Sequence, residues 1–365
     1  MSRIYNFGAG PAILPESVLQ EAAAGVLEIN GSGMSVIEVS HRGKDYEAIH
    51  FGAQADLLEL LGLSSDEYSV LFVQGGASMQ FALLPLNLLP AGSTADYVNA
   101  GEWGSKALKE AQKVGRGSAV EIATSADKNF SYIPKDFKIT PGAKYLHITT
   151  NNTIEGTEWF DLPDTGDVPL VADSSSDFMA LNRDHSKFSM IYAGAQKNAG
   201  PAGVAIVIAR KEFIAKSSKD IPTIFAYSNY ADKDSLYNTP PVFAIYVVGL
   251  VAKWLKANGG LAAIEKQNRD KAGVLYNAID SNSTVFKATV TAKEDRSLMN
   301  VTFRLQPEFE ALEKEFLKGA QERSLDGLKG HRNVGGFRAS IYNAFPPAGV
   351  DVLAQYIKEF AAKNA

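Results

Sequence analysis

Short runs of apolar and β-branched residues recur along the chain, and segments with helical spacing separate them. The runs are residues 70–73, 145–148, 170–173, 190–192 and 204–208. Runs this continuously apolar are typical of strands that are buried on both faces of a sheet. Before and between these runs, the apolar positions of residues 16–29, 46–61 and 105–113 recur at helical intervals. This alternation predicts an α/β fold with a mostly parallel sheet, of the seven-stranded type, and helices on both faces.

Two details refine this prediction. A turn rich in Gly and Ala joins the runs 190–192 and 204–208, which favours an antiparallel hairpin inside the sheet. The uncharged stretch 69–95 is interrupted by polar residues, Gly and Pro, and the apolar stretch 242–252 is short. A membrane-spanning helix needs about 20 mostly apolar residues, so we interpret both stretches as parts of a core.

The pattern changes after Gly260. A helical segment at 261–279 is followed by alternating segments at 285–291 and 299–303, a helix at 308–323, a strand at 337–342 and a last helix from about residue 349. This order predicts a smaller α+β domain. We expect residues 16–260 to form the larger domain, and residues 1–15 with 261–365 to form the smaller one. Because no low-complexity linker separates them, we expect a continuous helix at the boundary.

Composition excludes several functions. The 365 residues contain no Cys, so disulfides, Cys-ligated metals and a thiolate nucleophile are excluded. The net charge is −5 and no basic run exists, which disfavours nucleic-acid binding. The five His lack the spacing of a metal site, so we expect no metal. The N-terminus has no signal-peptide pattern, and we expect a cytoplasmic protein.

Two charged residues occupy unusual positions. Asp173 ends an apolar strand, where an open α/β sheet binds ligands, although a turn or helix-capping Asp would fit the same pattern. Lys197 lies among small residues between two strands. A desolvated lysine has a lowered pKa and becomes a nucleophilic amine, whereas the simpler interpretation is a loop lysine.

A Gly-rich turn at 74–80 follows the first of these strands and opens a helix, so its backbone N–H groups, with Ser78, are suited to an anion. It matches neither the P-loop nor the dinucleotide pattern. An anion cradle, a strand-end Asp and a nucleophilic Lys are together the parts that pyridoxal 5′-phosphate (PLP) requires. Lys197 would form the Schiff base, Asp173 would keep the pyridine nitrogen protonated, and Trp103 would stack on the ring.

Over nearly its whole length, the chain resembles the phosphoserine aminotransferase family, which belongs to the fold-type I PLP enzymes. The motifs that carry the resemblance are residues 6–12, 40–42, 75–81, 151–157, 172–175, 194–198 and 330–340. The resemblance implies the roles of Lys197, Asp173 and Trp103 given above, and places Thr153 near the ring hydroxyl. It also implies that the phosphate is bound by Ala77, Ser78, Gln196 and, from a second subunit, Asn238 and Thr239. A homodimer would then be obligatory for activity.

Arginines supply the expected substrate contacts. Arg338 lies on an apolar strand, which implies an anionic partner unless the position faces solvent. The pairs His41-Arg42 and His331-Arg332 are, taken singly, ordinary loop residues, but together they offer a second anion site. The resemblance assigns Arg338 to the substrate α-carboxylate and the two pairs to its distal anion, partly across the dimer interface.

The resemblance implies a ping-pong transamination in serine biosynthesis. Glutamate and 3-phosphohydroxypyruvate would give 2-oxoglutarate and O-phospho-L-serine, and some members of the family also act in pyridoxine biosynthesis. The alternatives are another fold-type I enzyme, such as an alanine–glyoxylate transaminase, and a non-catalytic phosphate- or nucleotide-binding protein. A cysteine desulfurase is excluded, because its nucleophile is a Cys thiolate.

Overall fold

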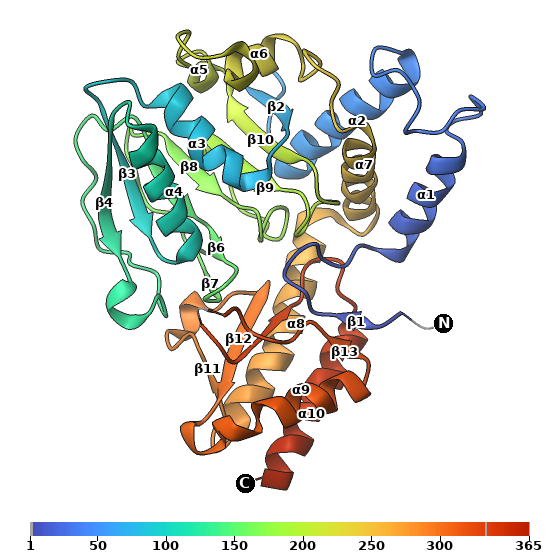
Figure 1. Ribbon diagram of the computed structural model, residues 1–365, viewed down its shortest axis with the longest axis vertical. Helices are drawn as coiled ribbons and strands as arrows, with labels where there is room; N and C mark the ends of the chain where they lie inside the picture. Colours follow the sequence, from blue (N-terminus) through green and yellow to red (C-terminus); the bar gives the residue numbers. More distant parts are fainter. Residues whose placement is uncertain (1–2, 333, 365) are drawn as a thin grey trace.

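The computed structural model describes residues 3–332 and 334–364, which form two lobes (Figure 1). A seven-stranded sheet in the order β2-β10-β9-β8-β5-β3-β4 forms the centre of the larger lobe. Its strands are β2 (Tyr68–Val73), β3 (Thr94–Asn99), β4 (Ser118–Thr124), β5 (Leu146–Thr149), β8 (Leu170–Asp173), β9 (Met190–Gly194) and β10 (Ala205–Arg210). β10 runs antiparallel to β2 and β9, and the other pairs are parallel. The predicted hairpin and parallel sheet are confirmed.

Helices cover both faces of this sheet. The helices α1 (Glu16–Leu27), α2 (Lys44–Leu61) and α7 (Val242–Ala257) pack on one face, and α3 (Gly76–Leu88), α4 (Glu102–Val114), α5 (Lys211–Ile214) and α6 (Tyr227–Asp232) pack on the other. Successive residues of β2 point to opposite faces: Val70 and Phe72 enter the first core, and Leu71 and Val73 enter the second. A strand buried on both faces explains why the sequence shows apolar runs instead of alternation.

The smaller lobe is α+β. Its antiparallel sheet β11-β12-β14 joins Phe286–Ala288, Asn300–Leu305 and Phe337–Ser340. The helices α8 (Gly260–Ser281), α9 (Glu313–Glu322) and α10 (Pro347–Asn364) pack against it. The strand β1 (Tyr5–Asn6) pairs with β13 (Leu325–Asp326), so the N-terminal segment lies in this lobe (Figure 1). Phe7 and Ile13 belong to the apolar core of the same lobe.

The expected continuous helix between the lobes is wrong. Helices α7 and α8 meet at an angle of 84°. Gly259 lies at the break in the left-handed conformation, with φ of 89°, which a residue without Cβ adopts at little cost. Within the described residues no single helix is long and apolar enough to cross a membrane, and α7 and α8 reach that length only as this bent pair.

Three further features differ from the predictions. The predicted helix at 308–323 begins as a 3₁₀ helix (Pro307–Leu312) and becomes α-helical only in α9. The edge strand β4 was not predicted, because its residues are mostly exposed or half-buried and its sequence is not an apolar run. A hairpin of two short strands, β6 (Asn151–Asn152) and β7 (Thr157–Glu158), also follows β5 and lies between the lobes.

Candidate active site

The parallel strands of the large sheet end at one edge, and the predicted site residues follow these ends. Residues 74–78 follow β2, residues 100–103 follow β3, Thr153 follows β5 and β6, and Lys197 follows β9, while Asp173 ends β8 itself. Open α/β sheets bind ligands outside the carboxyl ends of their strands. Topology therefore brings together residues that lie far apart in the sequence.

Lys197 is the centre of this cluster. Its Nζ atom donates a hydrogen bond to Thr153 Oγ1 at 2.7 Å and lies 5.0 Å from the centroid of the Trp103 ring. Loss of hydration lowers the pKa of Lys197 to about 8, although the negative charge of Asp173 opposes this shift. An ammonium with a pKa this low supplies a useful fraction of neutral amine near neutral pH, which a nucleophile requires.

Asp173 lies buried beside this lysine. Its Oδ1 atom accepts two hydrogen bonds from Ser175, one from the backbone N–H at 3.0 Å and one from the hydroxyl at 2.6 Å. Burial raises the pKa of Asp173, whereas the charge of Lys197 and the Ser175 bonds lower it. Both bonds fall on Oδ1, so among the described residues Oδ2 has no hydrogen-bond donor and can accept one from a ligand.

The start of α3 has the features of an anion cradle. Gly75 and Gly76 have φ values of 89° and 62°, and no side chain caps the helix. The first backbone N–H groups of a helix have no partner within it, and they attract anions. Ala77 is half-buried and Ser78 is exposed in this turn, so both border the open edge of the sheet. Gln196 is half-buried beside Lys197, and its carbonyl accepts the N–H of Ala12.

Arg338 enters the site from the smaller lobe. It lies on β14, and its Nη1 atom donates to the Thr153 carbonyl at 3.2 Å. Its buried Nε atom has no hydrogen-bond partner among the described residues. Burial lowers the pKa of His331, and the positive charges of Arg338 and Arg332 lower it further. Arg338 and Arg332 therefore supply the positive charge at the boundary between the lobes, and beside them the neutral form of His331 is favoured.

Among the described residues, four of the predicted site residues do not contact this cluster. His41 and Arg42 precede α2, and Asn238 and Thr239 precede α7. Their contacts among the described residues do not include Lys197, Thr153 or Arg338. The resemblance places them in a site shared with a second subunit, and this assignment stays a prediction.

A hydrogen-bond network that sequence reasoning missed supports Thr153. The Thr153 hydroxyl donates to Ser176 Oγ at 3.0 Å, and the Asn151 side chain donates to the same Ser176 oxygen and to Asn300 Oδ1 in the smaller lobe. Glu155, four residues from Asn151, is also buried here. The motif 151–157 contained most of these residues, but their partners come from distant segments of the chain.

Comparison with known proteins places this geometry in a family. The aminotransferase class-V family model matches residues 4–353. The phosphoserine aminotransferase of Desulfatibacillum aliphaticivorans is 53% identical over 364 residues, which cover 100% of this chain and 99% of that protein. The chain belongs to the class V aminotransferases.

Solved structures of class V aminotransferases agree with this assignment. The phosphoserine aminotransferase of Bacillus circulans subsp. alkalophilus superimposes with a TM-score of 0.95 at 48% identity, over 100% of this chain and 99% of that one. The PLP-bound phosphoserine aminotransferase of Trichomonas vaginalis gives a TM-score of 0.92 at 38% identity, over 98% and 100% of the two chains. The fold-type I architecture and the resemblance to phosphoserine aminotransferases are thereby confirmed.

The cofactor of this class V aminotransferase is PLP, and the residues at the sheet edge fit it. The Lys197 amine suits its aldehyde, the available Asp173 oxygen suits its protonated pyridine nitrogen, and the uncapped start of α3 suits its phosphate. Trp103 would form the wall against which the ring stacks. The aldehyde, the pyridine nitrogen and the phosphate of the cofactor thus each have a chemically matched group. Within the described chain, the hydrogen bonds that these groups make leave them accessible to the cofactor.

Proposed function

We propose that the protein transfers the amino group of glutamate to 3-phosphohydroxypyruvate, giving 2-oxoglutarate and O-phospho-L-serine, as a step of serine biosynthesis. The observation that carries this proposal is the Lys197 amine, whose pKa is lowered to about 8 and which faces Trp103 and Thr153. Relatives named phosphoserine aminotransferase that match the full length support this choice of substrate.

Lys197 and Asp173 would share the proton chemistry. Bound PLP supplies an electron sink, which makes the substrate Cα–H bond acidic. The neutral Nζ of Lys197 would take up the proton from the substrate Cα and deliver it to the C4′ carbon of the cofactor. The buried Asp173 carboxylate would hold a proton on the pyridine nitrogen, and Trp103 would exclude water from one face of the ring.

The phosphate of the cofactor would bind at the start of α3. Backbone N–H groups at Ala77 and Ser78, the Ser78 hydroxyl and the Gln196 side chain are the donors that this protomer offers. Asn238 and Thr239 would complete the site from a second subunit. We therefore propose a homodimer with shared active sites, in which neither protomer alone binds the cofactor fully.

Two anion sites would hold the substrate. Glutamate and O-phosphoserine both carry an α-carboxylate and a second anionic group, so one pair of sites serves both half-reactions. Arg338 would bind the α-carboxylate in a bidentate fork. His331 and Arg332, with His41 and Arg42 of the other subunit, would bind the distal group, and the positive charge of the two arginines would favour phosphate.

The two lobes suit different binding roles, one for the cofactor and one for the substrate. We propose that residues 16–260 are the cofactor-binding domain and that residues 1–15 with 261–365 are a smaller substrate-binding domain, since the N-terminal Phe7 packs in the core of the latter. We further propose that the enzyme acts in the cytoplasm on small molecules only, without nucleic-acid or membrane partners.

The substrate proposal can be tested by an assay with matched variants. Protein loaded with PLP is mixed with glutamate and 3-phosphohydroxypyruvate, and formation of O-phosphoserine is followed. Activity in Arg42→Ala and Arg332→Ala should fall for phosphoserine much more than for alanine, which has no distal anion. Full activity of both variants on phosphoserine would contradict the assignment of the distal site, and preference for alanine over phosphoserine in the unmodified protein would favour an alanine–glyoxylate type of reaction.

A further inference from the structure

Helix α4 carries Trp103 in its first turn, but it begins without a cap of its own. The residue before the helix is Gly101, which has no side chain to accept a hydrogen bond from the first turn, and within the described chain the Asn99 side chain accepts only the N–H of Gly101 and the hydroxyl of Ser105. The N–H of Glu102 instead donates to Glu155 Oε1 at 2.9 Å. The first N–H groups of a helix need such acceptors, and losing one destabilises the helix start. Glu155 thus caps α4 from a distant segment of the chain.

The Glu155 side chain is built tightly into this position. Only 4% of the residue is exposed, and its Oε2 atom has no partner among the described residues. A Cβ atom on Gly101 would lie 2.6 Å from that oxygen, so the carboxyl reaches the helix start only because residue 101 is Gly. Burial raises the pKa of Glu155 to about 7, while the bond from Glu102 opposes this shift. The acceptor is thus kept beside the helix although a carboxylate is costly to bury.

The main chain of Glu155 contacts the smaller lobe. The hydroxyl of Thr302 on β12 donates to the Glu155 carbonyl at 2.7 Å. Thr302 is the register partner of Arg338 on β14, and Arg338 donates to the Thr153 carbonyl. Main-chain carbonyls within residues 153–155 thus accept hydrogen bonds from the two strands that carry Thr302 and Arg338. The side-chain carboxyl of Glu155 accepts a hydrogen bond from the helix that carries Trp103.

We propose that Glu155 is a positioning residue that caps α4 from outside the helix and thereby fixes the Trp103 indole relative to Lys197 and to the Arg338 strand. This inference rests on the proposed function for its catalytic consequence, but the capping itself does not depend on any ligand. In this role, what matters is the position of the Glu155 oxygen that accepts the Glu102 N–H. The negative charge of the side chain is not required.

Three substitutions separate acceptor position from charge. Glu155→Gln keeps an oxygen at the same reach and removes the charge, Glu155→Asp keeps the charge and withdraws the oxygen by one methylene, and Glu155→Ala removes both. The emission of Trp103 in the cofactor-free protein is isolated by subtracting the spectrum of the same variant with Trp103→Phe. PLP affinity is then measured by titration.

The proposal predicts that Glu155→Gln resembles the unmodified protein. Glu155→Asp and Glu155→Ala should shift Trp103 emission toward that of an exposed indole and weaken PLP binding roughly 2- to 30-fold, the range for loss of a helix cap. If Glu155→Ala does not fold, the contrast between Gln and Asp still decides. The opposite pattern, with Asp like the unmodified protein and Gln shifted, would overturn the proposal, because charge would then matter and not the cap.

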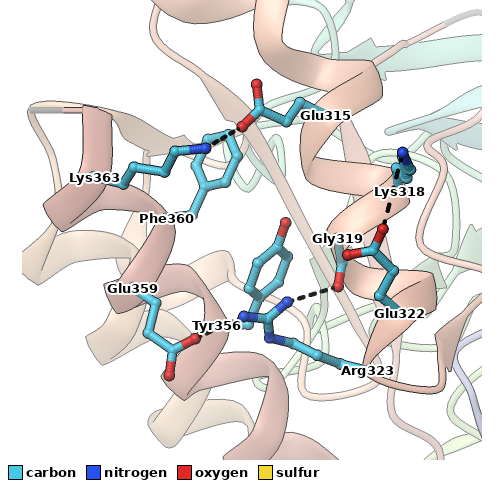
Figure 2. A pocket seen from close by; sticks show the side chains of 9 residues that line it. All are labelled: Glu315, Lys318, Gly319, Glu322, Arg323, Tyr356, Glu359, Phe360 and Lys363. Carbon is cyan, nitrogen blue, oxygen red and sulfur yellow. Dashed lines mark hydrogen bonds and ion pairs between the residues drawn. The ribbon is translucent and has the colours of Figure 1, made fainter.

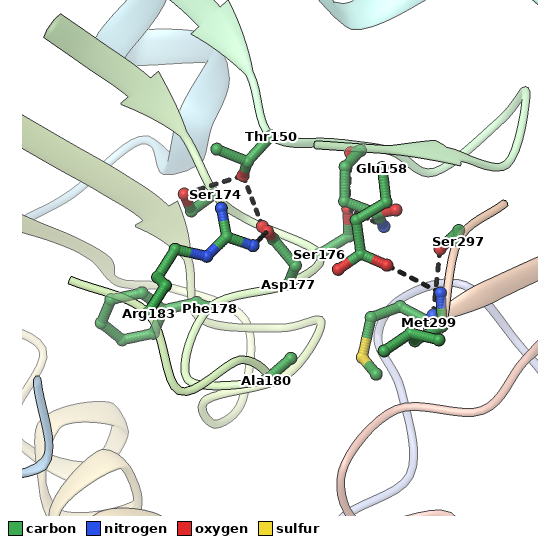
Figure 3. Close-up of polar contacts among 12 residues, drawn as sticks. Thr150, Glu158, Ser174, Ser176, Asp177, Phe178, Ala180, Arg183, Ser297 and Met299 are labelled. Carbon is green, nitrogen blue, oxygen red and sulfur yellow. Dashed lines mark hydrogen bonds and ion pairs between the residues drawn. The ribbon is translucent and has the colours of Figure 1, made fainter. Parts of the chain in front are cut away.

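Glu158 offers a matched control. It is also buried, and its Oε2 atom accepts the N–H of Leu298 in the smaller lobe at 2.7 Å. Figure 3 shows the Glu158 carboxyl group facing the segment that carries Ser297 and Met299. Glu158→Asp withdraws this acceptor by one methylene and therefore perturbs a contact between the lobes without touching α4, so it should leave Trp103 emission unchanged. An equal shift in Glu155→Asp and Glu158→Asp would show that Glu155 acts only through contact between the lobes. Failure of the unmodified protein to bind PLP would refute the proposed function, while the emission shifts would still test the cap.

Discussion

Two clusters of polar side chains in this protein differ in how far they satisfy one another. The groove between α9 and α10 is lined by ion pairs, among them Glu315 with Lys363 at 2.7 Å and Arg323 with Glu359 at 3.0 Å (Figure 2). At the carboxyl edge of the large sheet, by contrast, buried polar atoms of Trp103 and Arg338 have no partner among the described residues.

This difference separates a solvated surface from a ligand site. Exposed ion pairs satisfy one another and contribute little to stability, so the groove needs no ligand. Buried polar atoms are almost always hydrogen-bonded, and atoms that the protein leaves unpaired are the ones that a substrate or cofactor can satisfy. The larger number of charges in the groove is therefore a weaker sign of function than the few unpaired atoms at the sheet edge.

Removal of the amine at the sheet edge should have the largest effect. Lys197→Ala deletes the group that we expect to take up the substrate proton, so transamination should fall by at least about 10²–10⁴-fold, the usual contribution of a general base. The check is the steady-state rate of O-phosphoserine formation, with Lys363→Ala from the groove as the control. A Lys197→Ala variant that keeps a tenth of the activity would show that the amine at the sheet edge is not the general base.

Loss of the guanidinium whose Nε atom is unpaired among the described residues should have the next largest effect. Arg338→Ala removes the expected partner of the substrate α-carboxylate, and the KM for glutamate should rise about 10- to 150-fold, as for a hydrogen bond to a charged group. Arg323 of the groove provides a matched arginine, since Arg323→Ala should leave this KM unchanged. Similar KM values in both variants would mean that Arg338 faces no substrate.

A pH effect should distinguish the buried from the exposed carboxyl groups. Burial raises the pKa of Glu158 to about 8, and the nearby Asp177 charge raises it as well. The folded state therefore keeps a proton that the unfolded chain releases near its ordinary pKa. The free energy of unfolding should fall as the pH rises from about 5 to 8, by up to about 1.4 kcal/mol per pH unit for one proton.

Urea unfolding at several pH values measures this slope. Glu158→Gln cannot titrate, so its slope should be smaller than that of the unmodified protein. An unchanged slope in Glu158→Gln would show that the carboxyl does not titrate in this range.

The smallest effect belongs to the groove itself. Lys363→Ala breaks an exposed ion pair, for which we expect a change in unfolding free energy of about 0.2–1 kcal/mol and no change in PLP binding. Thermal unfolding with and without PLP measures both quantities. A change in cofactor affinity in this variant would show that the groove is coupled to the site.

The sequence predicts this protein well where local pattern decides the structure. The apolar strand ending in Asp173 and the small residues around Lys197 mark their elements directly. The break at Gly259 was not predicted, because helical pattern on both sides hides a bend that only packing between the lobes requires. The part played by Glu155 was missed for a related reason, since its partners Glu102 and Thr302 are distant in sequence.

Lys197, Asp173, Trp103 and Arg338 at the sheet edge together form the site at which we expect PLP-dependent transamination. The most direct test is the visible absorption of the purified protein after addition of PLP, followed by glutamate and then by 3-phosphohydroxypyruvate. We expect a visible band that glutamate removes and the phosphorylated oxo acid restores, and we expect Lys197→Ala not to show this cycle. A protein that stays colourless with PLP, or a band that glutamate leaves unchanged, would contradict it.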